Sequence, residues 1–270
     1  MTQLITSEKS SLAKSMISDR KARNIRVFQD TVAKYSSHPK LKESIAASLK
    51  EQEIYFDAED LFYPDVSDSY STKVVISGRR SMEAANVYAK DGDKVCVINF
   101  ASATNPGGGV TKGSNAQEEC LCRISTLYAT LNTKQCWDAF YGPHRALHNP
   151  IDSPVLSATF NKSLYNDDCI YTPNITVFKT DTQEPMLLPE KDWYQVDVIT
   201  CAAPNLREHP SNSYNPGSGF TKASISNVVL FRICFISSND NSLAGTNLVI
   251  GYSDNAFTPS AETRVICVLA

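Results

Sequence analysis

The amino-acid sequence predicts a three-layer α/β/α fold, in which helices cover both faces of a sheet, preceded by a helical N-terminal extension. Two observations lead to this prediction. First, short and almost continuously apolar segments, such as residues 73–77 (KVVIS) and 94–100 (KVCVINF), alternate with helical segments after residue 71. Strands that are buried on both faces have this pattern. Second, residues 1–50 are polar, and their apolar residues recur near helical spacing.

The N-terminal extension is expected to contain two helices. The first carries apolar residues at helical spacing, and residues 40–52 repeat that pattern. Residues 57–71 are rich in Asp, Ser and Tyr, which predicts a loop. We therefore expect an accessory helical region over residues 1–70 and one large α/β domain over residues 71–270.

The order of elements after residue 71 predicts where a ligand would bind. Residues 79–90 predict a helix between the strands at 73–77 and 94–100, and this succession favours a parallel β-α-β unit. Further along the chain, the same patterns predict one helix over 117–131, strands over 169–179, 197–202 and 247–252, and a helix over about 221–236. Ligand sites in such sheets lie beyond the carboxyl ends of the strands. The loop that follows residues 94–100 is therefore the first candidate.

Composition and charge narrow the class of protein. The formal net charge of -3 lacks the basic character of general nucleic-acid binding, so we expect no base-specific nucleic-acid partner. No apolar run approaches the roughly 20 residues that span a bilayer. The N-terminal segment also lacks the apolar core of a signal peptide, so we expect a cytoplasmic protein without a membrane partner. We also expect a monomer. The eight cysteines contain no CxxC pair, which predicts reduced thiols, no metal site and no cofactor.

The candidate loop is rich in glycine. Gly107, Gly108 and Gly109 are consecutive, so the backbone there lacks Cβ atoms and can adopt positive φ angles close to a ligand. Exposed N–H groups in such a loop can hold phosphate oxygens. Neither GxxxxGK[ST] nor GxGxxG is present, which excludes the two common nucleotide-binding fingerprints. A triple glycine on its own also fits a flexible turn.

Two adjacent glutamates follow the loop. The sequence Gln117-Glu118-Glu119 comes seven residues after Gly109, at the expected start of a helix. Glutamates at such a place often only face solvent, where the helix dipole favours negative charge. Here they lead into an apolar helix, and neighbouring helical residues point about 100° apart, so the two carboxylates can serve different roles. Mutual repulsion would raise the pKa of one of them, as a general acid requires, whereas the helix dipole would lower it.

The pattern of three glycines, seven residues and QEE resembles the signature of the poly(ADP-ribose) glycohydrolases. The segments NFASATNPGGG, CRISTLYATL, YTPNITVF and VITCAAPN are similar to the compact bacterial type of that family, over about residues 20–257. The resemblance implies a macrodomain-like α/β/α fold with a mixed sheet over residues 71–270. It also implies a glycosidase that cleaves ribose–ribose O-glycosidic bonds, with poly(ADP-ribose) or an ADP-ribosylated macromolecule as partner and with no metal.

The resemblance assigns roles to the central residues of the motif. Glu119 matches the catalytic acid of the family, and Glu118 matches the residue that orients the ribose hydroxyls. Gly107, Gly108 and Gly109, followed by Val110, would hold the diphosphate.

The resemblance also assigns roles around that motif. Gln117 would shape the site, and Asn105 would position a ribose. Phe257 would stack on the adenosine end of the ligand, although a core phenylalanine that follows a strand is the alternative.

One segment departs from the family pattern. The bacterial enzymes carry a second glycine-rich phosphate loop, whereas this chain has GYSDNAF at residues 251–257. Ser253 and Asn255 replace glycines, and Asp254 adds a negative charge that would disfavour a diphosphate if it faced the cleft. We therefore expect this loop to limit the affinity for ADP-ribose. Two alternatives stay open, namely an ADP-ribose-binding module with little turnover and a hydrolase of single ADP-ribose units.

Overall fold

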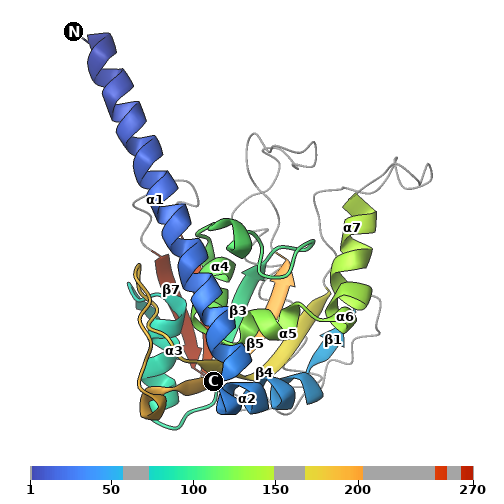
Figure 1. Cartoon of the computed structure of the whole chain (residues 1–270). Helices are drawn as coiled ribbons and strands as arrows, with labels where there is room; N and C mark the ends of the chain where they lie inside the picture. Colours follow the sequence, from blue (N-terminus) through green and yellow to red (C-terminus); the bar gives the residue numbers. More distant parts are fainter. Residues whose placement is uncertain (1, 57–72, 149–167, 203–246, 254–262, 270) are drawn as a thin grey trace.

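The computed structural model of the chain describes residues 2–56, 73–148, 168–202, 247–253 and 263–269 (Figure 1). The loop expected over residues 57–71, the helix expected over about 221–236 and the aromatic candidate Phe257 lie outside these residues. Of the departing segment GYSDNAF, only residues 251–253 are described, as the end of a strand.

A seven-stranded mixed sheet, with the order β1-β4-β5-β3-β6-β7-β2, forms the centre of the described chain. Its strands are β1 (Glu53–Tyr55), β2 (Lys73–Ser77), β3 (Val95–Ala101), β4 (Cys169–Val177), β5 (Tyr194–Ala202), β6 (Asn247–Ser253) and β7 (Thr263–Leu269). β3 is central and pairs in parallel with β5 and β6, whereas the other neighbours pair antiparallel. The α/β fold class with a mixed sheet is therefore confirmed.

The first β-α-β unit differs in one respect from its sequence-based expectation. β2 and β3 run in the same direction and are joined by a helix, α3 (Ser81–Lys90), as expected. They are not neighbours, because β6 and β7 lie between them and β2 pairs only with β7 at the edge. Strands from the C-terminal end of the chain are thus inserted into a unit formed near its beginning. Local patterns report the succession of elements, but not such long-range insertions.

The central strand is buried on both faces, which explains its continuous apolar sequence. Val95 and Val97 belong to the large core cluster that also contains residues of α3 and the helices after β3. Cys96 and Ile98, which alternate with them along the strand, belong to a second cluster on the opposite face, with side chains of β4 and β5. A strand with one face in solvent would alternate apolar and polar residues instead.

Helices surround one face of the sheet and extend beyond it. They are α1 (Thr2–Ser37), α2 (Pro39–Lys50), α3, α4 (Gln117–Ile124), α5 (Leu127–Leu131), α6 (Lys134–Cys136) and α7 (Gly142–His148), with a 3-10 turn η1 (Val110–Lys112) and a π-helical turn η2 (Trp137–Tyr141). Figure 1 shows that the N-terminal half of α1 projects well beyond the sheet, while its C-terminal half lies along α4. The predicted helical N-terminal extension is thus present. Among the described residues, no helix has the length and apolarity needed to cross a bilayer.

The single helix expected over residues 117–131 is wrong, because the chain divides it into α4 and α5. Ser125 has extended backbone angles, φ -141° and ψ 179°, and pairs with Val177 as an isolated β-bridge. The N–H of Thr126 donates to the carbonyl of Thr176 at 3.0 Å. The backbone at this point therefore exchanges helical hydrogen bonds for bonds to the end of β4, a tertiary effect that helical spacing does not reveal.

Candidate active site

The glycine loop lies directly after the carboxyl end of β3, where the sequence places a ligand site. Gly107 and Gly108 adopt left-handed backbone conformations, with φ of 67° and 56°. A Cβ on Gly107 would lie 2.7 Å from the Tyr128 ring. A Cβ on Gly108 would lie 2.7 Å from Oε1 of Glu119 and 2.9 Å from Oε2 of Glu118. Both glutamates therefore face the bare Cα of Gly108, which only glycine permits.

Glu119 joins the two ends of the loop. Its Oε1 accepts a hydrogen bond from the N–H of Gly109 at 2.9 Å, and its Oε2 accepts one from the N–H of Ala116 at 2.8 Å. The second contact is the backward arm of a capping box, in which a glutamate at the third helical position satisfies the N–H group that precedes α4. Glu119 is only 6% exposed. Each carboxylate oxygen keeps one lone pair for a further partner.

Glu118 is the more deeply buried of the two carboxyl groups, with 3% exposure. Its Oε2 accepts a hydrogen bond from the N–H of Ser102 at 2.8 Å. Its buried Oε1 has no partner of good hydrogen-bond geometry among the described residues, although the Gly107 N–H and the Asn99 side chain lie near the carboxylate and favour its charged form. Burial raises the pKa of Glu118 to about 8, the Ser102 N–H opposes this rise, and the charge of Glu119 adds to it. The raised pKa favours the protonated form of Glu118 at neutral pH, and in this form the carboxyl group can both donate and accept a hydrogen bond.

The N–H groups of the loop are mostly engaged inside the loop itself. The N–H of Gly108 donates to the carbonyl of Asn105 at 3.0 Å, and the N–H of Val110 donates to that of Gly107 at 3.0 Å. The N–H of Gly109 already serves Glu119. In this conformation the loop offers close approach of its backbone to a ligand, and fewer free donors than its sequence predicts.

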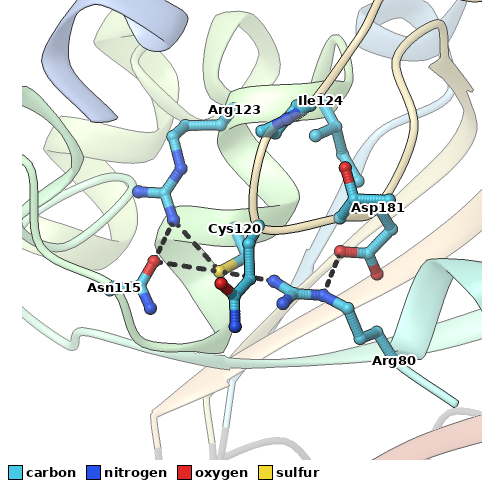
Figure 2. A pocket seen from close by; sticks show the side chains of 9 residues that line it. Arg80, Asn115, Cys120, Arg123, Ile124 and Asp181 are labelled. Carbon is cyan, nitrogen blue, oxygen red and sulfur yellow. Dashed lines mark hydrogen bonds and ion pairs between the residues drawn. The ribbon is translucent and has the colours of Figure 1, made fainter. Parts of the chain in front are cut away.

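A network behind α4 holds the other end of the loop. Arg123 is buried and donates to the Ser114 carbonyl at 2.6 Å, to Asn115 Oδ1 at 2.8 Å and to Cys120 Sγ at 3.0 Å. Figure 2 shows Arg80 approaching the same sulfur from the opposite side, at 3.2 Å. Arg80, Asn115, Cys120 and Arg123 line a small pocket. Cys120 directly follows Glu119, so this network fixes the first turn of α4 from the side that faces away from Gly108.

Charges in this network are partly balanced. Arg80 pairs with Asp181 at 2.7 Å (Figure 2). Asp181 also accepts a hydrogen bond from the N–H of Met82 at 3.0 Å. Burial raises the pKa of the Cys120 thiol, while Arg123 and Arg80 oppose that rise. The half-buried thiol is therefore a structural contact of the two guanidinium groups. Among the described residues, no three His, Cys, Asp or Glu side chains form a cluster that could hold a metal ion.

Comparison with known proteins supplies the family. Residues 26–180, more than half of the 270 residues, match the family described as "Microbial-type PARG, catalytic domain". The chain belongs to the microbial-type poly(ADP-ribose) glycohydrolase (PARG) family. It is accordingly a glycosidase with poly(ADP-ribose) glycohydrolase activity. No curated protein matches the chain.

Solved PARG structures share the fold. PARG from Thermomonospora curvata is 27% identical, with a TM-score of 0.60, over 81% of this chain and 75% of that one. The same enzyme bound to the inhibitor ADP-HPD is 25% identical, with a TM-score of 0.57, over 81% and 74% of the two chains. PARG from Deinococcus radiodurans in complex with ADP-ribose has 23% identity and a TM-score of 0.50, over 76% and 74%, which supports the fold alone. The predicted macrodomain-like fold is confirmed by these matches.

Two residues predicted to form part of the PARG substrate site, Gln117 and Val110, make internal contacts in this structure. Gln117 accepts the N–H of Phe100 at 2.9 Å and donates to the carbonyl of Ile98 at 2.8 Å, so its amide fastens α4 to the end of β3. Val110 is fully buried in the core beneath the loop. Their side chains hold the site in place, and a direct contact of either residue with substrate stays a prediction.

Asn105 lies at the rim of the PARG site. It is exposed, and its Oδ1 accepts a hydrogen bond from Arg145 of α7 at 2.5 Å. Its Nδ2 donates to Oγ1 of Thr104 at 3.0 Å. Phe257, the remaining predicted residue, lies outside the described part of the chain.

Sequence reasoning missed three residues that position the site. Ser102 supplies the N–H for Glu118, Tyr128 lies against Gly107, and Arg145 holds the segment before the glycines. Ser102 could have been found, because NFASATNPGGG places it between the strand and the loop. No local pattern indicates Tyr128 or Arg145, whose contacts depend on how α5 and α7 fold back onto the loop.

Proposed function

We propose that this chain hydrolyses the ribose–ribose O-glycosidic bonds of poly(ADP-ribose) and releases ADP-ribose, with Glu119 as the acid and base. The observation that supports this most is the convergence of Glu118 and Glu119 on the bare Cα of Gly108. This arrangement places two carboxyl groups within contact of a backbone that a sugar diphosphate can approach closely. It also follows the GGG-x7-QEE motif that the sequence shares with the family.

The proposed reaction needs one carboxyl group that changes its protonation state. Glu119, protonated, donates its proton to the ribose 2′-oxygen as the bond from that oxygen to the anomeric carbon breaks. The resulting oxocarbenium-like sugar is stabilised by the neighbouring diphosphate. The Glu119 carboxylate then accepts a proton from a water molecule as this water attacks the anomeric carbon. A diphosphate at the glycine loop adds negative charge, which favours a protonated carboxyl group nearby.

Glu118 is proposed to orient the ribose hydroxyls. Its unpartnered Oε1 and its protonated state at neutral pH make it both a donor and an acceptor for a sugar hydroxyl. Burial of a polar group without a partner is costly, so a substrate hydroxyl that meets it gains affinity from the contact.

We also propose that residues 1–70 form an accessory region and residues 71–270 the catalytic domain. The accessory region contributes to the site through α1. Asn24 donates to the Gly113 carbonyl at 3.1 Å, and a Cβ on Gly113 would lie 2.4 Å from the Lys21 carbonyl oxygen. The helix thus supports the loop that connects Gly109 to α4.

The altered segment at residues 251–257 supports a second candidate, an ADP-ribose-binding module with little turnover. Two substrates, purified poly(ADP-ribose) and mono-ADP-ribosylated protein, and one ligand, free ADP-ribose, separate the candidates. Chromatography of the products and calorimetry with ADP-ribose are the readouts. Release of ADP-ribose from polymer supports the proposal. Tight binding without any product supports the binding module, and release only from the mono-modified protein supports a hydrolase of single units.

A further inference from the structure

Arg145 of α7 lies against the segment that leads into the glycine loop. Arg145 Nε donates to the carbonyl of Thr104 at 2.7 Å, and its Nη2 donates to Oδ1 of Asn105 at 2.5 Å. The two groups are 40 and 41 residues away in sequence, so these contacts tie α7 to the loop across the fold. A planar guanidinium can serve two acceptors at once, which a lysine ammonium cannot do in the same geometry.

The guanidinium is itself held in place by an aromatic ring. Its Cζ lies 4.5 Å from the centroid of the Trp137 ring, a cation–π contact. The indole Nε1 donates to Oδ1 of Asn132 at 2.9 Å, which fixes the ring. Trp137 opens η2, and Arg145 lies two helical turns later on the continuous segment formed by η2 and α7. Ring and cation are therefore presented to the loop as one preformed unit.

The segment that Arg145 holds, Thr104 and Asn105, is connected through hydrogen bonds to Gly108 and to Glu118. The N–H of Gly108 donates to the carbonyl of Asn105 at 3.0 Å. The N–H of Asn105 donates to Oγ of Ser102 at 3.2 Å, and the N–H of Ser102 donates to Glu118 at 2.8 Å. The position of Asn105 thus determines where Gly108 turns and how Ser102 meets Glu118.

We infer that Arg145 is a positioning residue for the binding of ADP-ribose. Arg145, which is itself held by the Trp137 ring, keeps Asn105 and the start of the glycine loop in place. The inference rests on the proposed function, because Asn105 is the residue proposed to meet a ribose. Arg145 is exposed, so its hydrogen bonds contribute little to the global stability of the fold. Their main effect is to restrict the conformations of the loop. Its loss then allows Asn105 to adopt other rotamers, and ligand binding must restrict them again.

The test compares ADP-ribose affinity, steady-state kinetics on polymer and thermal unfolding for a set of variants. We expect Arg145→Ala to weaken ADP-ribose binding by roughly tenfold, the scale of one charge-assisted hydrogen bond. KM should rise more than kcat falls, and Tm should change little. Arg145→Lys should stay close to Arg145→Ala, because the charge alone does not reproduce the fork. Arg26→Ala, at an exposed arginine of α1, is the matched control and should leave all values unchanged.

A double-mutant cycle shows whether Arg145 acts through Asn105. If it does, Asn105→Ala with Arg145→Ala weakens binding no more than Asn105→Ala alone. Additive losses, or full affinity in Arg145→Ala, overturn the inference. Wild-type affinity in Arg145→Lys also overturns it, since that indicates that the charge alone is sufficient. Calorimetry distinguishes this inference from the proposed function: ADP-ribose bound by the wild type without polymer hydrolysis overturns the activity alone.

Discussion

At the scale of single residues, the site depends on the absence of a side chain at Gly108. Gly108 has a left-handed backbone conformation, and a Cβ at this position would lie within 3 Å of an oxygen of Glu118 and of Glu119. The space between the loop and the two carboxyl groups is therefore too small for a side chain at this position. Any larger substituent must displace a glutamate, and Glu119 is held at both oxygens by backbone N–H groups. The arrangement cannot relax around a side chain without breaking one of these bonds.

Gly108→Ala should therefore abolish activity by displacing the carboxyl groups. We expect a loss of kcat/KM of at least about 100-fold, comparable to the loss of an electrostatic contact in an active site. Gly92→Ala is the matched control, because Gly92 also has a positive φ, 85°, but a Cβ there meets nothing within 4 Å. Both variants pay about 1 kcal/mol of backbone strain in unfolding experiments. Equal activity in the two variants would show that the contact with the glutamates is unimportant.

Glu118 gives the fold a defined dependence on pH. Its pKa is raised from 4.5 to about 8 in the folded chain. The native state thus retains a proton that the unfolded chain loses near 4.5, so its contribution to stability is fully present below that value and is lost as the pH rises through about 8. Glu118→Gln, which cannot ionise, should lack this loss. Thermal unfolding between pH 5 and pH 9 measures it, with the exposed Glu43→Gln as control. Parallel curves for wild type and Glu118→Gln would contradict the assignment.

At the scale of elements, the contact between α4 and β3 determines how the two glutamates are placed. Gln117 bridges α4 and β3 through its amide, since Oε1 accepts a hydrogen bond and Nε2 donates to Ile98 and to Ser81 Oγ at 3.2 Å. This contact determines the direction in which the first turn of α4 presents its carboxyl groups. The spacing between loop and helix in the sequence has a structural meaning only because this contact holds both ends.

Replacing the Gln117 amide by a carboxylate should weaken this contact without changing its shape. Gln117→Glu keeps the acceptor for Phe100 but places an oxygen against the carbonyl of Ile98. We expect a loss of about 1–3 kcal/mol in the free energy of unfolding, the cost of leaving buried polar groups unpaired. Denaturant titration checks this, with the exposed Gln135→Glu as the matched control. A loss confined to the control would disprove the role of this contact.

The sequence predicted elements and site to different degrees, for reasons that are physical. The glycine loop, Glu118 and Glu119 lie within thirteen residues of one another, so local reasoning could bring them together. The break after Ile124 could not be foreseen, because it depends on hydrogen bonds to β4. The separation of β2 from β3 depends on strands that come last in the chain. Arg145 likewise meets the loop only after α7 has packed.

At the scale of the whole molecule, we expect ADP-ribose binding to depend also on the segment at residues 251–257. Its first residues end β6, the parallel neighbour of β3, so the segment starts at the same edge of the sheet as the glycine loop. Negative charge at Asp254 should oppose a diphosphate there. We expect Asp254→Gly to tighten ADP-ribose binding, and the gain to shrink at high salt because screening weakens the repulsion. Calorimetry at two salt concentrations measures this. Unchanged affinity in Asp254→Gly and Asp254→Asn, with binding abolished in Gly108→Val, would show that the first loop alone holds the ligand.

The most direct test of the account is the release of ADP-ribose from purified poly(ADP-ribose) by the wild type and by Glu119→Gln. The glutamine keeps the size of the side chain but can neither donate a carboxyl proton nor activate water. The account predicts that the wild type releases ADP-ribose, and that Glu119→Gln is reduced at least about 1,000-fold, within the range for a group that acts as both acid and base. Its affinity for ADP-ribose should stay within a few fold of the wild type. Full release of ADP-ribose by Glu119→Gln would contradict the account.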